Sequence, residues 1–337
     1  MEKEKIELIQ IEMLTEKERN SVDAFLLSPN TNGEFINSLG YLAYHPRERF
    51  TEDSVVVRDV ASKTVRGVML ATIDPENPKR VVSHMGTTFA GPILDQKLSI
   101  EGIETVLDLL MNYYEQRYEE IILKTTPPCY TAQPFDSIGY FLLRRGYTFG
   151  MTALANVIDL TQLHTEVDIL QLFDAKKRNQ TKKALKNESF IFGTSPCIRS
   201  EVWDQMNENL YHKFNSKTTH TYEEICDLAR RVPERIQAFY VDTSDGDYGA
   251  FALVYKFKNV YHTQYLDTNY HYTGEYPNLL LVLRLIEQAM KEGYRYFSFG
   301  ASTEAGGNIM NTGLYNYKSG YGGGDILLPK YTWRKKA

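Results

Sequence analysis

One lysine stands in an unusual setting near the end of the chain. The stretch LYNYKSGYGGG, Leu314 to Gly324, surrounds Lys318 with tyrosines and glycines, a composition that predicts neither a good helix nor an ordinary turn. An ammonium group in a narrow aromatic groove can stabilise the oxyanion of an acyl-transfer intermediate or hold a phosphate, because a low dielectric strengthens its field. Alternatively, its stem covers aromatic rings while the amine reaches water. Lys318 is therefore a catalytic candidate with a structural alternative.

Small polar and aromatic residues near this stretch are candidates for substrate binding. The chain has 24 tyrosines, and those of the second half, Tyr315 among them, could line a sugar-binding groove or fill a core. Ser302 and Asn308 follow the end of a predicted strand and could line a pocket, although small polar residues are common in any loop. These three residues are hypotheses for contacts to a substrate.

A basic run without any acid, KKRNQTKK, occupies Lys176 to Lys183. At helical spacing Arg178, Lys182 and Lys186 share one face. Such a face is often merely solvated. It can also be a phosphate-binding strip, in which arginine makes bidentate contacts and lysines act as point charges. We therefore expect Arg178 before Lys182 to contact an anionic substrate.

Three residues are candidates for the general base that an attacking amine would need. His84 ends a predicted strand beside a loop rich in Gly and Thr, and His262 lies on the corresponding strand of the second half. An unperturbed histidine titrates near neutral pH, although either histidine could equally be a hydrogen-bonded structural residue. Asp267 is a competing base, and the sequence does not choose among the three.

Composition excludes several classes of protein. The chain has 337 residues, enough for two domains, with 42% hydrophobic and 24% charged residues and a net charge of -5. This balance argues against DNA binding and membrane insertion, and no segment resembles a signal peptide or a transmembrane span. The Walker, HExxH and GxSxG motifs are absent.

Cysteine usage predicts a cytoplasmic protein. The chain has three cysteines, far apart and odd in number, which form neither a disulfide framework nor a metal-ligand spacing. We therefore expect no metal, and no cysteine or serine stands out as a covalent carrier of a transferred group.

Two copies of one pattern run along the chain. FLLRRGYTFG, in the first half, has the aromatic, cationic and glycine spacing of LYNYKSGYGG. Helical apolar positions in 103–114 recur at the same interval in 279–290, and three strand-like runs precede each helix. We predict a tandem duplication with an α/β (α+β) fold, each copy being a mixed, mainly antiparallel sheet flanked by helices. The expected domains are 1–158 and 188–337, joined by a basic helical segment, 159–187.

The order of several segments resembles the FemA/FemB/FemX aminoacyltransferases and their relatives in the GNAT acyltransferase superfamily. The resemblance covers nearly the whole chain and implies two tandem GNAT-like domains. It also implies transfer of an acyl or aminoacyl group, from a thioester or a charged tRNA, to an amine. The segments that carry it are EFINSLGYLAYHPRERF (34–50), VSHMGTTFAGPI (82–93), KKRNQTKKALKN (176–187), YPNLLLVLRLIEQAMKEGYRYFSFGAST (276–303) and GLYNYKSGYGG (313–323).

The resemblance also implies roles for individual residues. Tyr317 and Lys318 match an aromatic and lysine pair linked to catalysis in Fem enzymes, and Arg178 matches a position that contacts the diphosphate of their precursor substrate. The loops that hold the pyrophosphate of coenzyme A in GNAT enzymes correspond here to GTTFAGP and HYTGEYP. From these loops we expect the donor to contact Gly86, Thr87, Thr273 and Gly274.

Several functions remain open at this point. An acyltransferase that uses acyl-CoA, with acetyl-CoA as the expected donor and no tightly bound cofactor, would modify an amino sugar or another cell-envelope precursor. An aminoacyl-tRNA-dependent enzyme would act on a peptidoglycan precursor, but the chain lacks the helical arm of many Fem enzymes, which favours acyl-CoA. A third alternative is a non-catalytic module that binds nucleotide-linked sugars, and a fourth is RNA binding by the basic run.

Overall fold

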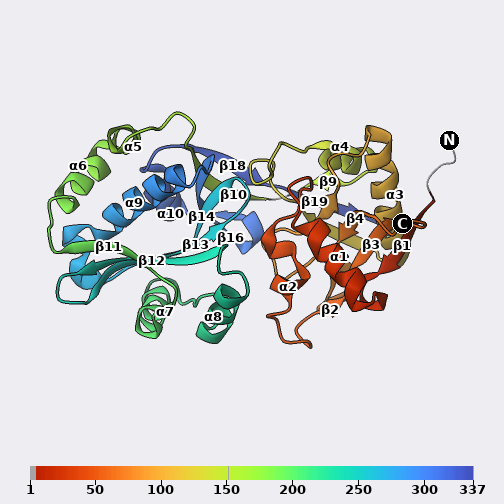
Figure 1. Ribbon diagram of the computed structural model, residues 1–337, viewed down its shortest axis with the longest axis horizontal. Helices are drawn as coiled ribbons and strands as arrows, with labels where there is room; N and C mark the ends of the chain where they lie inside the picture. Colours follow the sequence, from red (N-terminus) through yellow and green to blue (C-terminus); the bar gives the residue numbers. More distant parts are fainter. Residues whose placement is uncertain (1–4, 151, 337) are drawn as a thin grey trace. The chain divides into compact units, whose positions relative to one another are not determined.

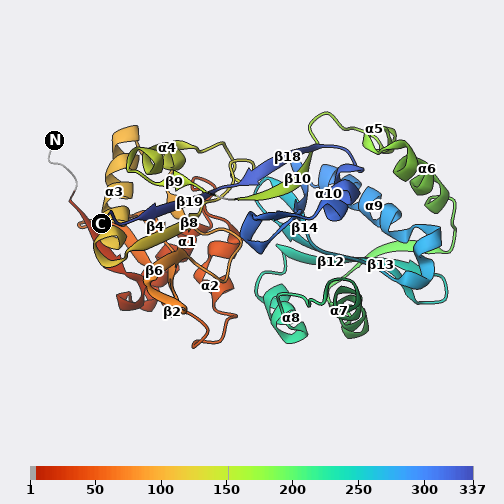
Figure 2. The ribbon, with the colours of Figure 1, turned by 180° about the vertical axis from the view of Figure 1, so that it is seen from behind.

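The protein folds as two units. The structure, a computed structural model, describes residues 5–150 and 152–336. Unit 1 contains the chain up to Ala153 together with the C-terminal segment from Leu327, and unit 2 is Leu154–Ile326. The chain therefore passes from one unit to the other twice (Figures 1 and 2).

Unit 1 contains two sheets. All strand pairs of the first sheet are antiparallel, whereas the second sheet contains the parallel pair β6 and β8. The first sheet has the order β1 (Ile6–Gln10), β3 (Val55–Asp59), β4 (Val65–Met69), β7 (Pro92–Leu94), and the second has the order β2 (Thr51–Glu52), β5 (Ala71–Asp74), β6 (Asn77–Ser83), β8 (Glu120–Lys124), β19 (Lys330–Arg334), β9 (Thr148–Phe149).

The helices of unit 1 pack on these sheets through apolar faces. Thr15 caps α1 in the predicted capping box with Glu18. Val55 and Val57 share a core with α3, whereas Val56 packs with α1, as the alternation of side chains along a strand requires. The helices are η1 (Ile11–Met13), α1 (Glu16–Leu26), η2 (Phe35–Asn37), α2 (Leu39–Leu42), α3 (Ile100–Arg117) and α4 (Ser137–Arg144).

Unit 2 is built around one larger sheet. Antiparallel pairs connect β11 through β14, β14 is parallel to β15, and β15 is antiparallel to β10. A small hairpin, β16 (Thr303–Glu304) and β17 (Ile309–Met310), follows β15. The order of the sheet is β11 (Phe190–Ser195), β12 (Ile236–Thr243), β13 (Tyr248–Lys256), β14 (Val260–Thr268), β15 (Tyr296–Ala301), β10 (Ala153–Asp159), β18 (Gly324–Leu328).

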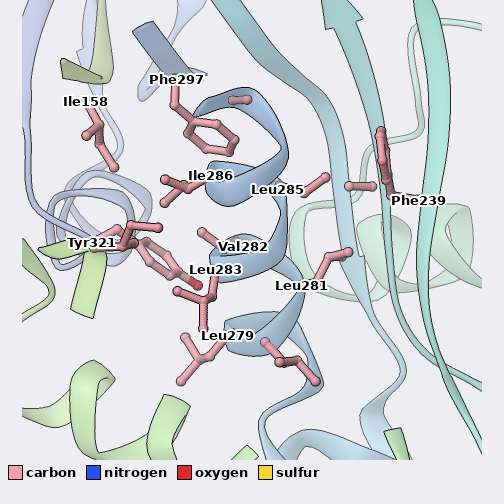
Figure 3. Packing of buried hydrophobic residues seen from close by; sticks show 14 of the residues in the cluster. Ile158, Phe239, Leu279, Leu281, Val282, Leu283, Leu285, Ile286, Phe297 and Tyr321 are labelled. Atoms are coloured by element: carbon pink, nitrogen blue, oxygen red, sulfur yellow. The ribbon is translucent and has the colours of Figure 1, made fainter. Parts of the chain in front are cut away.

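Helices cover both faces of this sheet. Figure 1 shows α9 and α6 on one side and α7 and α8 on the other. The apolar face of α9 packs against the sheet residues Phe239 and Phe297 (Figure 3). The helices are α5 (Glu166–Leu172), α6 (Ala175–Ala184), α7 (Ser200–Phe214), α8 (Tyr222–Arg231), η3 (Tyr270–Glu275), α9 (Pro277–Lys291), η4 (Ala305–Gly307) and α10 (Thr312–Ser319).

The segment 159–187 belongs to unit 2, which differs from the expected bridging role. Its helices α5 and α6 place Ile169, Phe173 and Ala184 in the same apolar core as α9. Burial of these side chains ties the segment to unit 2. The expected domain 188–337 also differs at its end, because β19 pairs with β8 and β9 in unit 1.

The two units repeat one strand order, so the predicted α/β tandem duplication is confirmed. In each unit, the strand that follows the long helix lies in the sheet beside a strand that is distant from it in the sequence. The order is β8, β19, β9 in unit 1 and β15, β10, β18 in unit 2. The stretch around Lys318, in contrast, forms helix α10, where the sequence predicted no good helix. Asn311 caps this helix by accepting from the backbone N–H of Leu314, which helps it to start despite Gly313.

Candidate active site

Two parallel strands separate at the centre of unit 2. The strands β14 and β15 are in register over three pairs, from Val260–Tyr296 to His262–Ser298. Beyond these pairs β14 continues beside β13 as far as Thr268, while β15 continues beside β10 as far as Ala301. The strands therefore splay, and the carboxyl end of β14 borders a groove.

This groove is a polar hollow in unit 2, with a volume of about 820 Å³. It lies where the end of β14, the start of α9, α10 and α6 meet. Three lysines and two aspartates line it together with aromatic and amide side chains. The lining residues used below are Asp174, Lys176, Lys177, Gln180, Lys213, Asp267, Tyr270, Thr273, Asn278, Asn316 and Tyr317.

Lys177 is held against the aromatic part of the groove. Its Nζ lies 4.3 Å from the ring centroid of Tyr317 and 4.5 Å from that of Tyr321. Burial lowers the pKa of Lys177, and the neighbouring Asp174 opposes this change. A Cβ at Gly320 would lie 2.5 Å from Cε of Lys177, so the absence of a side chain at Gly320 makes room for the lysine. The groove thus has a positioned cation on an aromatic surface.

Asp267 is the carboxylate best placed for proton transfer. Its side chain accepts hydrogen bonds from Nδ2 of Asn209, at 3.1 and 3.2 Å, and from the hydroxyl of Tyr248 at 3.3 Å. Burial raises the pKa of Asp267, and these donors reduce the shift only in part. A carboxylate with a raised pKa is a stronger base than an exposed one, which suits Asp267 to accept a proton from an amine.

Lys318 anchors the end of β15. Asn316 and Tyr317 of α10 line the groove. Lys318, in contrast, donates hydrogen bonds from Nζ to the backbone oxygens of Gly300, at 3.1 Å, and Ala301, at 2.5 Å. The residue is 8% exposed, and burial lowers its pKa to about 8. An ammonium has three N–H donors, so one remains after these two hydrogen bonds. Lys318 therefore has a structural contact and one donor left for a ligand.

His262 sits at the point where the strands separate, but it is a poor base. Its Nδ1 lies 3.2 Å from the Ser298 hydroxyl, and its ring packs beneath Gly300. Burial and the positive charge of Lys318 lower the pKa of His262 to about 3. The imidazole is neutral at physiological pH and binds protons weakly, which favours Asp267 over His262 as the base.

Tyr317 is the aromatic residue of α10 that reaches the groove. Its hydroxyl accepts from Nδ2 of Asn278 at 3.1 Å and lies 2.9 Å from the hydroxyl of Tyr321. Burial raises the pKa of Tyr317, which keeps the phenol protonated. Tyr317 can therefore donate a hydrogen bond or a proton to a group that becomes negative in the groove.

Three of the predicted substrate contacts have partners within unit 2. Ser302, fully buried, donates to Oδ1 of Asn156 at 2.9 Å, and Asn156 donates to Asp325. Tyr315 donates to the other carboxylate oxygen of Asp325 at 2.8 Å. Asn308 is exposed and donates to the carbonyl of Ala305 within its own turn. The structure gives these residues bonds that stabilise β10, β18 and the hairpin region, and it does not bring them to the groove lining.

The basic run presents two faces. Lys176, Lys177 and Gln180 line the groove, whereas Arg178 and Lys182 lie at helical positions on another side of α6. Lys182 is exposed, and neither Arg178 nor Lys182 forms an ion pair with a described residue. The structure therefore brings to the groove the lysines before Arg178 rather than Arg178 itself.

The donor loop predicted in unit 1 is closed. The ring of His84 is 1% exposed; its Nε2 faces Oε1 of Glu52 at 2.9 Å, and its Nδ1 accepts from the backbone N–H of Gly86 at 3.1 Å. The N–H and hydroxyl of Thr87 both donate to the carbonyl of His84. These contacts give His84 a structural role and occupy backbone groups that a pyrophosphate would need.

The corresponding loop of unit 2 is more open. Thr273 lines the groove and donates to the carbonyl of Tyr270, and a Cβ at Gly274 would meet no atom within 4 Å. Nearby, α9 begins with Pro277 at its first turn and has no side-chain cap. Its positive end is therefore directed at the same side of the groove as Thr273.

Several groove residues had no motif to mark them. Lys213, at the end of α7, has its Nζ 4.5 Å from the ring centroid of Tyr270, and Asn209 holds Asp267. Asn278 follows Pro277 at a helix start, the one sequence signal that could have drawn attention to it. The lysine and Asn209 reach the site only through tertiary packing.

Residues 173–319 match the family model for an acetyltransferase (GNAT) domain. The chain carries a GNAT domain. The match spans the elements that form the groove, from the residue before Asp174 to the end of α10. No curated protein sequence matches the chain.

Solved structures share this fold over almost the whole chain, among them a protein described as a tandem GNAT protein. FemX has a TM-score of 0.68 at 11% identity, covering 98% of this chain and 97% of its own. L-PGS from Bacillus licheniformis has a TM-score of 0.58 at 11% identity, covering 96% and 92%. A tandem GNAT protein from the clavulanic acid biosynthesis pathway, solved without AcCoA, has a TM-score of 0.52 at 11% identity, covering 99% of both chains. The predicted FemX-like tandem GNAT fold is confirmed.

Proposed function

We propose that this GNAT protein is an N-acyltransferase whose chemistry takes place in unit 2. It transfers an acyl group from an acyl-CoA, with acetyl-CoA as the first candidate, to an amine of a sugar or cell-envelope precursor. The observation that carries the proposal is the groove at the splay of β14 and β15, which combines cations, a carboxylate of raised pKa and a neutral phenol. These are the groups that direct acyl transfer to an amine requires.

The donor is held through its phosphates. Lys176, Lys177 and Lys213 supply positive charge, and the uncapped start of α9 adds the positive end of a helix dipole. Tyr270 offers a ring on which a base can stack. The neighbouring GNAT protein described as solved without AcCoA supports acetyl-CoA as the donor to try first.

The reaction needs one proton acceptor and one proton donor. The carboxylate of Asp267 takes a proton from the acceptor ammonium, and the free amine attacks the thioester carbonyl. The C–N bond forms and the C–S bond breaks. The second proton, which the nitrogen loses as it becomes an amide, reaches the departing thiolate through the hydroxyl of Tyr317 or through water, and Asp267 releases the first proton to solvent. The amide and the free thiol are the products, with no covalent enzyme intermediate.

Lys318 stabilises the tetrahedral intermediate in this proposal. Two of its N–H groups bind backbone oxygens, and the third is assigned to the carbonyl oxygen of the donor as that oxygen becomes negative. Its two backbone acceptors fix its position in advance, so little reorganisation is needed during the reaction. His262 remains neutral beneath it.

An aminoacyl-tRNA donor is the second candidate. The fold shared with FemX and L-PGS favours it, and the lysines would contact the phosphates of a tRNA end as readily as those of coenzyme A. Each helix among the described residues is too short or too polar to cross a bilayer. A cytoplasmic location stays a prediction from cysteine usage.

The test is a donor and acceptor assay with the full chain. Calorimetry measures binding of acetyl-CoA, and release of free thiol is followed with a panel containing glucosamine and nucleotide-linked amino sugars. We expect saturable acetyl-CoA binding and thiol release that depends on the amine. Transfer from charged tRNA without acetyl-CoA binding would replace the donor. Failure of both donors to support transfer would overturn the enzyme proposal and favour a binding module.

A further inference from the structure

Unit 1 has a cavity of its own, next to the closed loop at His84. It has a volume of about 350 Å³ and lies beneath η1, α1 and α2, beside the segment that leads into β3. Much of its wall is apolar, including Ile11, Leu39, Leu42, Phe50 and Leu70. A space of this size can hold a small organic molecule.

One carboxylate stands out in this wall. Asp53 lines the cavity and is 7% exposed. Its Oδ1 accepts from the hydroxyl of Tyr113 at 2.7 Å and from Nε2 of Gln10 at 3.3 Å, and its Oδ2 accepts from the hydroxyl of Tyr118 at 2.7 Å. All of these donors are neutral. No lysine or arginine of the described residues forms an ion pair with Asp53.

The surrounding tyrosines are fixed as neutral donors. Burial, and then the hydrogen bond to Asp53, raises the pKa of Tyr113 to about 12. The pKa of Tyr118 is raised further by the same causes. Tyr114 is fully buried and donates to the backbone oxygen of Asp53 at 2.6 Å, which fixes the main chain there. The carboxylate is thus rigidly placed before any ligand arrives.

We propose that this cavity binds a small organic monocation, a primary ammonium on a compact apolar body. A buried carboxylate without a cation is unusual, because buried charges are ordinarily paired. A carboxylate can accept about four hydrogen bonds, so three occupied positions leave room for an N–H of the ligand at Oδ2. The carbon body then fills the space between Phe50 and the leucines.

The other charged residues of the lining define the ligand further. Arg19 donates to the backbone oxygens of Leu14 and Glu12, and Arg47 is exposed. His45 and Glu52 also belong to the lining, and Glu52 faces His84 and Ser54. Glu12 and Glu52 balance the charges of the two arginines in this wall, so the lining has one net negative charge, equal to that of Asp53. A single ammonium therefore matches the site better than a polyamine.

This inference is independent of the proposed function. It rests on residues of unit 1, none of which lines the groove of unit 2. A protein without acyltransferase activity would still have the cavity, and an active enzyme could lack the amine site.

The experiment compares three probes of one size with the full chain. Calorimetry near neutral pH measures pentylamine, pentan-1-ol and pentanoate. We expect saturable binding of pentylamine alone, with a stoichiometry of one. Asp53→Asn should weaken it by roughly tenfold or more, the effect of losing a charged hydrogen bond. Glu48→Gln removes an exposed charge from the same region outside the lining and should leave pentylamine affinity unchanged.

A second variant guards against misfolding of the first. Ala43 is exposed at the cavity and ends α2, so Ala43→Phe should fold while filling the space, and it should abolish pentylamine binding. Equal binding of pentan-1-ol would overturn the role of the carboxylate. Absence of pentylamine binding in the wild type, or its persistence in both variants, would overturn the site.

Discussion

The two units build the same pair of parallel strands and then use it in opposite ways. In unit 1 the N–H groups of Ala90 and Gly91 donate to the carbonyl of Lys124 at the end of β8, and Nζ of Lys124 donates to Thr87 at 2.6 Å. In unit 2 the strands β14 and β15 separate after three pairs, and a groove of about 820 Å³ borders β14. A loop covers the splay of unit 1, whereas the splay of unit 2 is open.

The difference lies in one loop and one lysine. Each splay has a lysine whose pKa is lowered by burial to about 8. Lys124 donates to one backbone carbonyl and Lys318 donates to two. Lys124 belongs to the strand itself and binds the loop that covers the splay. Lys318 comes from α10 and binds the end of β15 through the backbone oxygens of Gly300 and Ala301. The two units thus share one frame, and a loop determines which of them has an open splay.

The largest effect should come from removing the carboxylate of the open unit. We expect Asp267→Asn to lower turnover about 10²- to 10⁴-fold, the usual contribution of a general base, while acetyl-CoA binding is retained. The pKa of Asp267 is raised by burial, so the wild-type rate should increase with pH through a range above that of an ordinary aspartate. Steady-state rates across pH measure both effects.

Stability separates this role from a structural one. A raised aspartate pKa in the folded state means that its stabilising contribution is present at low pH and is lost as pH rises through the folded pKa. Near neutral pH, Asp267→Asn should therefore unfold no more easily than the wild type. Asp204→Asn, an exposed position on α7, is the matched control for turnover. Full activity of Asp267→Asn would remove Asp267 from the mechanism.

Much of the frame could be predicted from the sequence, but the choice of residues within it could not. The periodicity of α3 and α9 and the capping box at Thr15 are local signals, and the structure confirms them. The positions of β10 and β19 in their sheets could not be predicted, because the sequence of a strand does not identify a pairing partner that is distant in the chain. Helix α6 has almost no apolar stripe, so its phase, and hence the choice of Lys177 over Arg178, depended on the tertiary fold. Likewise, burial of His262 is invisible in the sequence.

Backbone strain gives the next largest contrast between the copies. Gly146 after α4 and Gly323 after α10 both have positive φ, at 90° and 87°. A Cβ at Gly146 would meet no atom within 4 Å, whereas at Gly323 it would collide with the backbone of Val157. We expect Gly146→Ala to cost about 1 kcal/mol and Gly323→Ala about 2 to 4 kcal/mol in the free energy of unfolding. Denaturant titration measures both. Equal costs would show that the contact with β10 relaxes easily.

Loss of one lysine from the groove should have a smaller effect. We expect Lys177→Ala to weaken acetyl-CoA binding by roughly fivefold, about 1 kcal/mol, and the difference should shrink with added salt. Lys183→Ala removes an exposed charge from the same helix and serves as the control. Arg178→Ala decides between the two faces of α6: a loss larger than that of Lys177→Ala would favour the face predicted from the sequence.

The finest comparison sets Lys124 against Lys318 through the pH dependence of stability. Both pKa values are lowered from 10.5 to about 8, so between these limits the unfolded chain binds more protons than the folded one. The free energy of unfolding should therefore rise with pH from about 8 to 9, by at most about 1.4 kcal/mol per pH unit for each lysine, before the tyrosines of the unfolded chain ionise near pH 10. Lys124→Met and Lys318→Met should each flatten this slope, as measured by denaturant titration at successive pH values.

Turnover should distinguish the two variants, because only Lys318 lies at an open splay. If both variants flatten the slope equally and only Lys318→Met loses activity, then Lys124 stabilises the covered splay of unit 1 and Lys318 takes part in the reaction in unit 2. Equal loss of activity in both would mean that burial, and not position at the splay, governs their importance.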